Sequence, residues 1–124
     1  MNIIVTARKG LRGEIRVPGD KSISHRAIIL SSIAEGETSV HGLQSGEDVR
    51  RTMAAFQAMG VSFRQKELDD LRVLGVGLKG LREPYEVLDM GNSGTSMRLL
   101  AGLLSGQPFF SVLTGDKYLC NRPM

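Results

Sequence analysis

The sequence predicts an α/β (α+β) fold, because segments with helical spacing alternate with short segments typical of strands. Residues 22–34 and 95–104 are strongly apolar runs, and small polar residues that favour a helix start precede them. The order is helix, strand, helix, hairpin, and then a further helix and strand. We therefore predict an α/β unit that begins to repeat, in a chain of 124 residues that is long enough for one core.

Two short strands are predicted before the first helix. Residues 3–6 are apolar or β-branched, and residues 13–17 alternate between apolar and charged side chains. Gly10 and Gly13 allow the chain to turn between them. We expect a hairpin or two edge strands.

The most informative stretch is residues 18–26, where a Pro-Gly turn precedes a helix start. Ser22 is the predicted N-cap of a helix over residues 22–34. The N–H groups at the helix start, the Lys21 ammonium and the Arg26 guanidinium are expected to converge near the turn. This arrangement predicts an anion site suited to a phosphate monoester.

A strand is predicted at residues 38–43, followed by a second helix. Ser45 lies three residues before Asp48, which is the spacing of a capping box. Gly60 stands where a glycine commonly ends a helix.

A hairpin is predicted next, with strands at residues 61–64 and 71–74 around a polar turn at residues 66–70. Residues 75–84 contain three glycines but match no nucleotide-binding fingerprint. We interpret them as a connector.

A second candidate anion site lies at residues 89–98, where glycines and small polar residues precede an apolar helix. Gly94 lacks a Cβ, so the backbone there is open to close approach by a ligand. Asn92 is interpreted as a ligand contact or only as a helix cap. A strand at residues 109–113 and a final loop complete the chain.

The composition is that of a globular protein, with 41% hydrophobic and 23% charged residues. Its 16 Lys and Arg do not alternate with aromatic residues, which argues against nucleic-acid binding. The single cysteine, Cys120, cannot form an internal disulfide, and no Cys/His spacing predicts a metal site. No segment predicts membrane insertion, so we expect a cytoplasmic protein.

Other candidate residues have ordinary interpretations. His25 is expected to be half-exposed on its helix, His41 to be a strand residue, and Cys120 to be an ordinary thiol. The helices predicted at residues 22–34 and 95–104 are apolar on nearly every side. We expect that the chain is truncated or that a partner covers them.

Three motifs occur in order: residues 18–27 (PGDKSISHRA), residues 91–98 (GNSGTSMR), and Gly-Asp at 115–116 followed by Arg-Pro-Met at 122–124. With these motifs the chain resembles the 5-enolpyruvylshikimate-3-phosphate synthase family. The resemblance covers essentially the whole chain but only the N-terminal part of the longer family enzyme. It implies two domains, each built from repeated βαβαββ units, with the substrates bound in the cleft between them.

The resemblance also implies an assignment of segments. Residues 1–17 resemble strands that cross to the other domain. Residues 18–124 resemble the first βαβαββ unit and the start of the second unit of the N-terminal-side domain.

The activity implied by the resemblance is transfer of the enolpyruvyl group of phosphoenolpyruvate to the 5-hydroxyl of 3-phosphoshikimate, with release of phosphate. This step belongs to aromatic amino acid (chorismate) biosynthesis and uses no metal or organic cofactor. The implied partners are the two substrates and the missing remainder of the enzyme, which completes the cleft. The isolated chain is therefore expected to be inactive.

The motif match carries roles to individual positions of this sequence. The residues implied to contact 3-phosphoshikimate are Lys21, Ser22 and Arg26. Those implied to contact phosphoenolpyruvate are Lys21, Asn92, Gly94 and Arg122. Lys21 is also the implied catalytic residue, and Thr95 is implied to order the loop.

Two departures and two alternatives accompany the match. Leu99 stands where many members carry proline, and Lys117-Tyr118 replaces a more usual acidic or small pair. The sister family that acts on UDP-N-acetylglucosamine is one alternative, although its motif resembles Lys followed by Asn whereas Ser22 follows Lys21 here. A non-catalytic phosphate-binding or structural fragment is the other.

Overall fold

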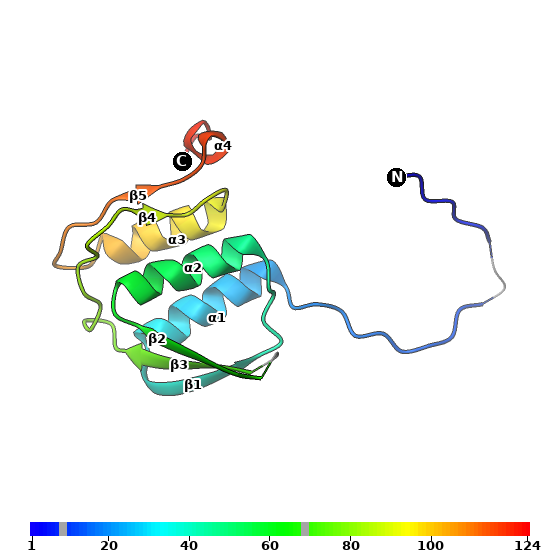
Figure 1. Ribbon diagram of the computed structural model, residues 1–124, viewed down its shortest axis with the longest axis horizontal. Helices are drawn as coiled ribbons and strands as arrows, with labels where there is room; N and C mark the ends of the chain where they lie inside the picture. The colour runs from blue at the N-terminus through cyan, green and yellow to red at the C-terminus, as the bar shows by residue number, and fades with distance from the viewer. Residues whose placement is uncertain (8–9, 68–69) are drawn as a thin grey trace.

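The structure is a computed structural model that describes residues 1–7, 10–67 and 70–124. The helices are α1 (Lys21–Ile33), α2 (Glu47–Ala58), α3 (Gly94–Leu104) and α4 (Lys117–Cys120), and the strands are β1 (Glu35–His41), β2 (Ser62–Glu67), β3 (Asp70–Val76), β4 (Leu88–Asp89) and β5 (Leu113–Thr114). Figure 1 shows a layer of helices between a three-stranded sheet and the β4–β5 pair. The predicted α/β fold is confirmed.

The three-stranded sheet has the order β1-β3-β2, and both pairings are antiparallel. The predicted hairpin is therefore present as β2 and β3, although residues 68–69 of its turn lie outside the described residues. The strand predicted at residues 38–43 instead spans Glu35–His41, because every residue of β1 pairs with a residue of β3.

The second sheet is short and parallel. Leu88 pairs with Leu113, and Asp89 pairs with Thr114. The strand predicted at residues 109–113 is thus mostly wrong: only two residues find a partner, and a strand exists only where its backbone groups are paired.

The N-cap predicted for the first helix is wrong. Asp20, rather than Ser22, has extended backbone angles, and its side chain accepts a hydrogen bond of 2.7 Å from the Ile23 N–H. Gly19 explains the earlier start, because a Cβ there would lie 2.0 Å from the Gly42 carbonyl oxygen. This tight contact fixes the turn one step before Asp20, and Ser22 is already inside the helix.

The second helix also begins differently from the prediction. Its N-cap is Gly46, which makes no side-chain capping bond, so Ser45 does not form the predicted capping box. Instead the Gln44 side chain accepts a 2.9 Å hydrogen bond from the Gly46 N–H. The end of the helix agrees with the prediction, because Gly60 follows it with a φ of 95°.

The core extends from the three-stranded sheet through the helix layer to the segments around β4 and α4. Its largest fully buried apolar side chains include Ile28, Phe56, Met59, Met90 and Leu100. These residues come from all three long helices and from the segments between them, so the core joins the whole region after residue 18 into one unit.

Helix α1 buries a face that combines two isoleucines with His25 and serines. Ile23 and Leu30 are 68% and 63% exposed, whereas His25 is fully buried. The expectation of a half-exposed His25 is therefore wrong. The expectation that α1 is apolar on nearly every side agrees with these two uncovered side chains.

Residues 1–7 and 10–17 run away from the rest of the chain in Figure 1. Their described residues contain no strand, so the strands predicted at residues 3–6 and 13–17 are not formed here. Ile3, Ile4 and Val5 are between 76% and 88% exposed. A strand needs a neighbouring backbone, and nothing in the described part of this chain offers one to this segment.

Candidate functional site

The start of α1 carries three of the predicted site residues, all exposed: Lys21, Ser22 and Arg26. The Lys21 ammonium lies 2.9 Å from the Asp48 carboxylate, and the Arg26 guanidinium donates a 3.0 Å hydrogen bond to the Ser22 carbonyl oxygen. The sequence predicted that the two cations converge on one point. In the structure they instead bond to different protein oxygens. The Asp48 carboxylate would compete with an anion for Lys21, whereas the Arg26 guanidinium keeps further N–H donors besides the one that Ser22 accepts.

The Asp20 carboxylate modifies the same site, because it already accepts from the Ile23 N–H at the helix start. This part of the predicted anion site is occupied by the protein's own carboxylate. The positive charge available there comes from the two side chains rather than from the first backbone N–H groups.

The start of α3 is capped by Ser93, whose hydroxyl accepts from the Ser96 N–H at 3.2 Å. The interpretation of Asn92 as the helix cap is therefore wrong. Gly91 has a φ of 56°, which turns the chain so that the Asn92 side chain is free to point toward the last loop.

Asn92 and Arg122 meet although they are 30 residues apart. The Arg122 guanidinium donates to the Asn92 side-chain oxygen, and the Asn92 amide donates a 2.9 Å hydrogen bond to Asp116. A Cβ on Gly94 would lie 3.6 Å from the same guanidinium. The structure thus brings together the three residues predicted to contact phosphoenolpyruvate besides Lys21.

Asp116 is the centre of this loop. Its carboxylate caps α4 by accepting from the Tyr118 and Leu119 N–H groups at 3.0 and 2.7 Å. The Leu119 hydrogen bond is the main reason that the pKa of Asp116 lies below its usual value, and Asn92 and Arg122 lower it further. A carboxylate that is ionised near neutral pH therefore orients Asn92.

An open hollow lies between the start of α2 and the segments that carry Asn92 and Asp116. Its lining includes Glu47, Asp48, Arg51, Asp89, Asn92 and Asp116. Arg51 crosses it, bonded to Glu47 at 3.0 Å and to Asp89 at 2.9 Å. Because Asp48 both lines this hollow and pairs with Lys21, the ammonium lies on the same side of the molecule as Asn92.

Beneath the hollow, buried polar side chains link the three long helices. His25 Nδ1 lies 2.8 Å from Thr52 Oγ1, which lies 2.7 Å from Ser96 Oγ, which lies 2.6 Å from Ser93 Oγ. Burial lowers the pKa of His25, and the nearby Lys21 and Arg26 charges lower it further while Asp48 opposes them. The imidazole is therefore neutral near pH 7.

The sequence reasoning missed this buried chain. Its local signal is weak, because single Ser, Thr and His residues within helices are usually solvated. Contacts between residues 27 and 44 positions apart depend on how the helices pack.

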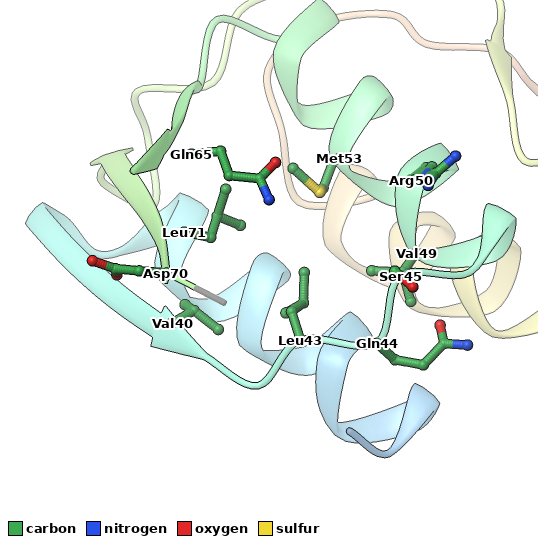
Figure 2. Close-up of a pocket in the computed structure, with 10 residues that line it drawn as sticks. All are labelled: Val40, Leu43, Gln44, Ser45, Val49, Arg50, Met53, Gln65, Asp70 and Leu71. Atoms are coloured by element: carbon green, nitrogen blue, oxygen red, sulfur yellow. The ribbon is translucent and has the colours of Figure 1, made fainter. Parts of the chain in front are cut away.

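Another cavity lies elsewhere among the described residues. Figure 2 shows it between the ends of β1 and β3 and the first turns of α2. It has a volume of about 190 Å³, and its lining includes Val40, Leu43, Val49, Arg50 and Leu71. None of the predicted site residues lines it, whereas Asn92 lines the open hollow and Lys21 and Arg122 bond to residues of its lining. The candidate site is therefore the open hollow with these side chains.

Among the described residues, every helix is too short or too polar to span a lipid bilayer. In those same ranges, His, Cys, Asp and Glu side chains form no group of three or more that could bind a metal ion.

The fold and the site together define an α/β protein in which two exposed basic side chains, Lys21 and Arg122, bond to residues that line one open hollow. Exposed cations of this kind suit anionic ligands. The model of the family described as EPSP synthase (3-phosphoshikimate 1-carboxyvinyltransferase) matches residues 5–124. The chain belongs to this family.

Individual relatives agree with the family match. The 3-phosphoshikimate 1-carboxyvinyltransferases of Geotalea uraniireducens and Geobacter metallireducens are 64% and 62% identical over 94% and 97% of this chain. The solved structure of EPSP synthase from Acinetobacter baumannii superposes with a TM-score of 0.86 at 54% identity, over 90% of this chain.

The chain spans only about a quarter of these proteins: 27% and 28% of the two relatives, and 26% of the chain in the solved structure. The sister family that acts on UDP-N-acetylglucosamine is not favoured by these comparisons.

Proposed function

We propose that this chain forms one side of a site that transfers the enolpyruvyl group of phosphoenolpyruvate to the 5-hydroxyl of 3-phosphoshikimate and releases phosphate. The regions of the family fold that the chain does not span would supply the other side. The observation that carries the proposal is the meeting of Asn92, Gly94 and Arg122 beside the hollow on which Asp48 holds Lys21.

The electrostatics of the site support this reaction. Both substrates carry a phosphate and a carboxylate, so a site that holds them together must offset several negative charges. Lys21 and Arg26 are proposed to face 3-phosphoshikimate, with the Ser22 hydroxyl as a further donor. Arg122 is proposed to face the phosphoenolpyruvate anion, and its guanidinium is exposed enough to exchange Asn92 for a ligand oxygen.

The proposed role of Lys21 follows from its present partner. The Lys21 side chain is 52% exposed, and among the described residues Asp48 is the partner of its ammonium. A phosphate with two negative charges competes well with one carboxylate for an ammonium. When Lys21 turns to the ligand it neutralises charge next to the oxygen that reacts, and we therefore assign it as the catalytic residue of this chain.

The reaction adds the 5-hydroxyl across the enol double bond and then eliminates phosphate, so it requires proton transfer to and from carbon and oxygen. His25 is not proposed for this work, because it is fully buried and bonded to Thr52. Thr95 is proposed to order the loop at the start of α3. The expected cytoplasmic location remains a prediction.

The test uses a chimera in which this chain replaces the matching segment of the Geotalea uraniireducens enzyme. We expect phosphate release that depends on both substrates. Lys21→Met should lower kcat/KM by about a hundredfold or more, as loss of a charged group at the reacting centre commonly does. Lys79→Met, an exposed lysine in the connector, is the matched control and should retain activity.

The chimera also separates the alternatives. Activity with UDP-N-acetylglucosamine in place of 3-phosphoshikimate would contradict the proposal, as would equal losses in the Lys21 and Lys79 variants. A folded chimera without activity on either acceptor would favour a structural role for this chain.

A further inference from the structure

The buried chain of His25, Thr52, Ser96 and Ser93 joins α1, α2 and α3 in the interior. All four side chains are at most 2% exposed. Each link is between 2.6 and 2.8 Å, which is typical of well-formed hydrogen bonds. Polar side chains in a core are costly unless they are paired, so a paired chain fixes how its elements pack.

Each end of this chain lies next to residues of the proposed site. His25 directly precedes Arg26 and lies one helical turn after Lys21. Ser93 lies between Asn92 and Gly94 and caps α3. The buried chain therefore runs from the proposed 3-phosphoshikimate side to the proposed phosphoenolpyruvate side.

Thr52 is the central link. Its hydroxyl contacts His25 on α1 and Ser96 on α3, and it lies 3.3 Å from the carbonyl oxygen of Asp48. Asp48 in turn holds Lys21. One side chain on α2 thus contacts both neighbouring helices and the turn that carries the partner of Lys21.

We propose that Thr52 is a positioning residue, whose hydroxyl holds the starts of α1 and α3 at the separation that lets the two sides of the site act on one pair of substrates. This inference rests on the proposed function. Thr52 touches no substrate, and its effect passes through His25 and Ser96.

The hydrogen-bonding groups of the chain support this role. A neutral imidazole has one nitrogen that donates and one that accepts, so Nδ1 can bond to the hydroxyl in either tautomer. His25 Nε2 is buried and has no hydrogen-bond partner among the described residues. Among the described residues, the hydrogen bonds of this ring therefore run through Nδ1, and the one to Thr52, at 2.8 Å, is shorter than the 3.5 Å contact with Ser96.

Two substitutions at one position test the inference. Thr52→Val keeps the shape of the side chain and removes the hydroxyl, whereas Thr52→Ser keeps the hydroxyl. Val73→Ala is the control for lost stability, because Val73 is fully buried in β3 and is no member of the buried chain.

In the chimera, Thr52→Val is expected to lower kcat/KM by about tenfold or more, since small misplacements of binding groups have effects of that order. The dissociation constant for 3-phosphoshikimate alone should stay within about twofold, because that ligand needs only the α1 side. Thr52→Ser should restore most of the activity, and Val73→Ala should leave kcat/KM close to that of the parent. Equal losses in Thr52→Val and Val73→Ala, or no rescue by serine, would overturn the inference.

A second measurement does not depend on activity. Residual dipolar couplings of the 124-residue chain report the orientation of α1 relative to α3. We expect Thr52→Val to change or broaden this orientation, and Thr52→Ser and Val73→Ala to preserve it. An unchanged orientation in Thr52→Val would overturn the inference even if the chimera is active. An inactive parent chimera would contradict the proposed function, and the couplings alone would then decide on Thr52.

Discussion

Asp48 restrains Lys21 in the absence of ligand, so Asp48→Asn should strengthen anion binding. The ion pair is 2.9 Å long, and the two side chains are 52% and 26% exposed. Exposed pairs of this kind contribute about 0.2 to 1 kcal/mol. A phosphate that recruits Lys21 must first break the pair, so its removal should raise the affinity of the 124-residue chain for 3-phosphoshikimate by about 1.4-fold to 5-fold.

The assay is an NMR titration that follows the backbone amides of residues 20–26. Glu83→Gln is the charge-matched control, because it also removes one negative charge and lies on an exposed connector residue. The gain should shrink as salt is added, since screening weakens the pair in the parent chain. An affinity that falls in Asp48→Asn, or that rises equally in Glu83→Gln, would refute the competition between carboxylate and phosphate.

Three further predictions concern single residues. Burial lowers the pKa of His25 below 6.5, so the unfolded chain binds the proton more readily than the folded chain. The contribution of His25 to the free energy of unfolding should therefore fall as pH drops below about 6.5 and stay constant above it. Urea unfolding between pH 5 and 8 should show this dependence for the parent and much less of it for His25→Gln. Gly94→Ala should fold normally, because the new Cβ makes only a 3.6 Å contact with Arg122, but phosphoenolpyruvate binding by the chimera should weaken in calorimetry. Gly19→Ala should lower the melting temperature strongly, because its Cβ would lie 2.0 Å from the Gly42 carbonyl oxygen.

Each of these predictions has a result that contradicts it. A pH dependence that persists unchanged in His25→Gln would assign it to another group. Undiminished phosphoenolpyruvate binding in Gly94→Ala would remove that residue from the ligand surface. Gly102→Ala is the control for both glycine variants, because a Cβ at Gly102 meets nothing within 4 Å. A melting temperature lowered no more by Gly19→Ala than by Gly102→Ala would contradict the third prediction.

The local features of the fold could be predicted because neighbouring residues determine them. The apolar spacing of α2, the hairpin of β2 and β3 and the terminating Gly60 all follow from short-range rules. The start of α1 shows the limit of such rules. Asp20 and Ser22 are equally good caps, and the choice depends on the contact between Gly19 and Gly42, which is 23 residues distant in the chain.

Strands whose partners come from elsewhere could not be predicted in the same way. Residues 3–6 have the composition of a strand but find no partner in the described residues, and β5 retains only Leu113–Thr114. Propensity states that a segment can pair. Whether it does pair depends on a neighbouring strand with free backbone groups, and the sequence of the segment itself does not specify that strand.

The candidate site likewise has a part that the sequence predicted and a part that only the structure gives. The motifs identified Asn92, Gly94 and Arg122, and the structure adds what joins them: Asp116 caps α4 and orients Asn92 toward the guanidinium. Helix α1 is the harder case. Its apolar residues surround the helix, so hydrophobicity did not indicate which face is buried. In the packed structure the buried face is the one that carries Ser24 and His25.

That choice has a functional consequence if Thr52 acts as proposed. A purely apolar contact between α1, α2 and α3 would tolerate small shifts of one helix along another, because apolar contacts have no direction. Hydrogen bonds at 2.6 to 2.8 Å do not tolerate such shifts, and the buried chain holds the helices in one arrangement. Helix α1 leaves Ile23 and Leu30 exposed while it buries a histidine and serines. This arrangement costs hydrophobic burial, and in return it fixes where Lys21 lies relative to Asn92.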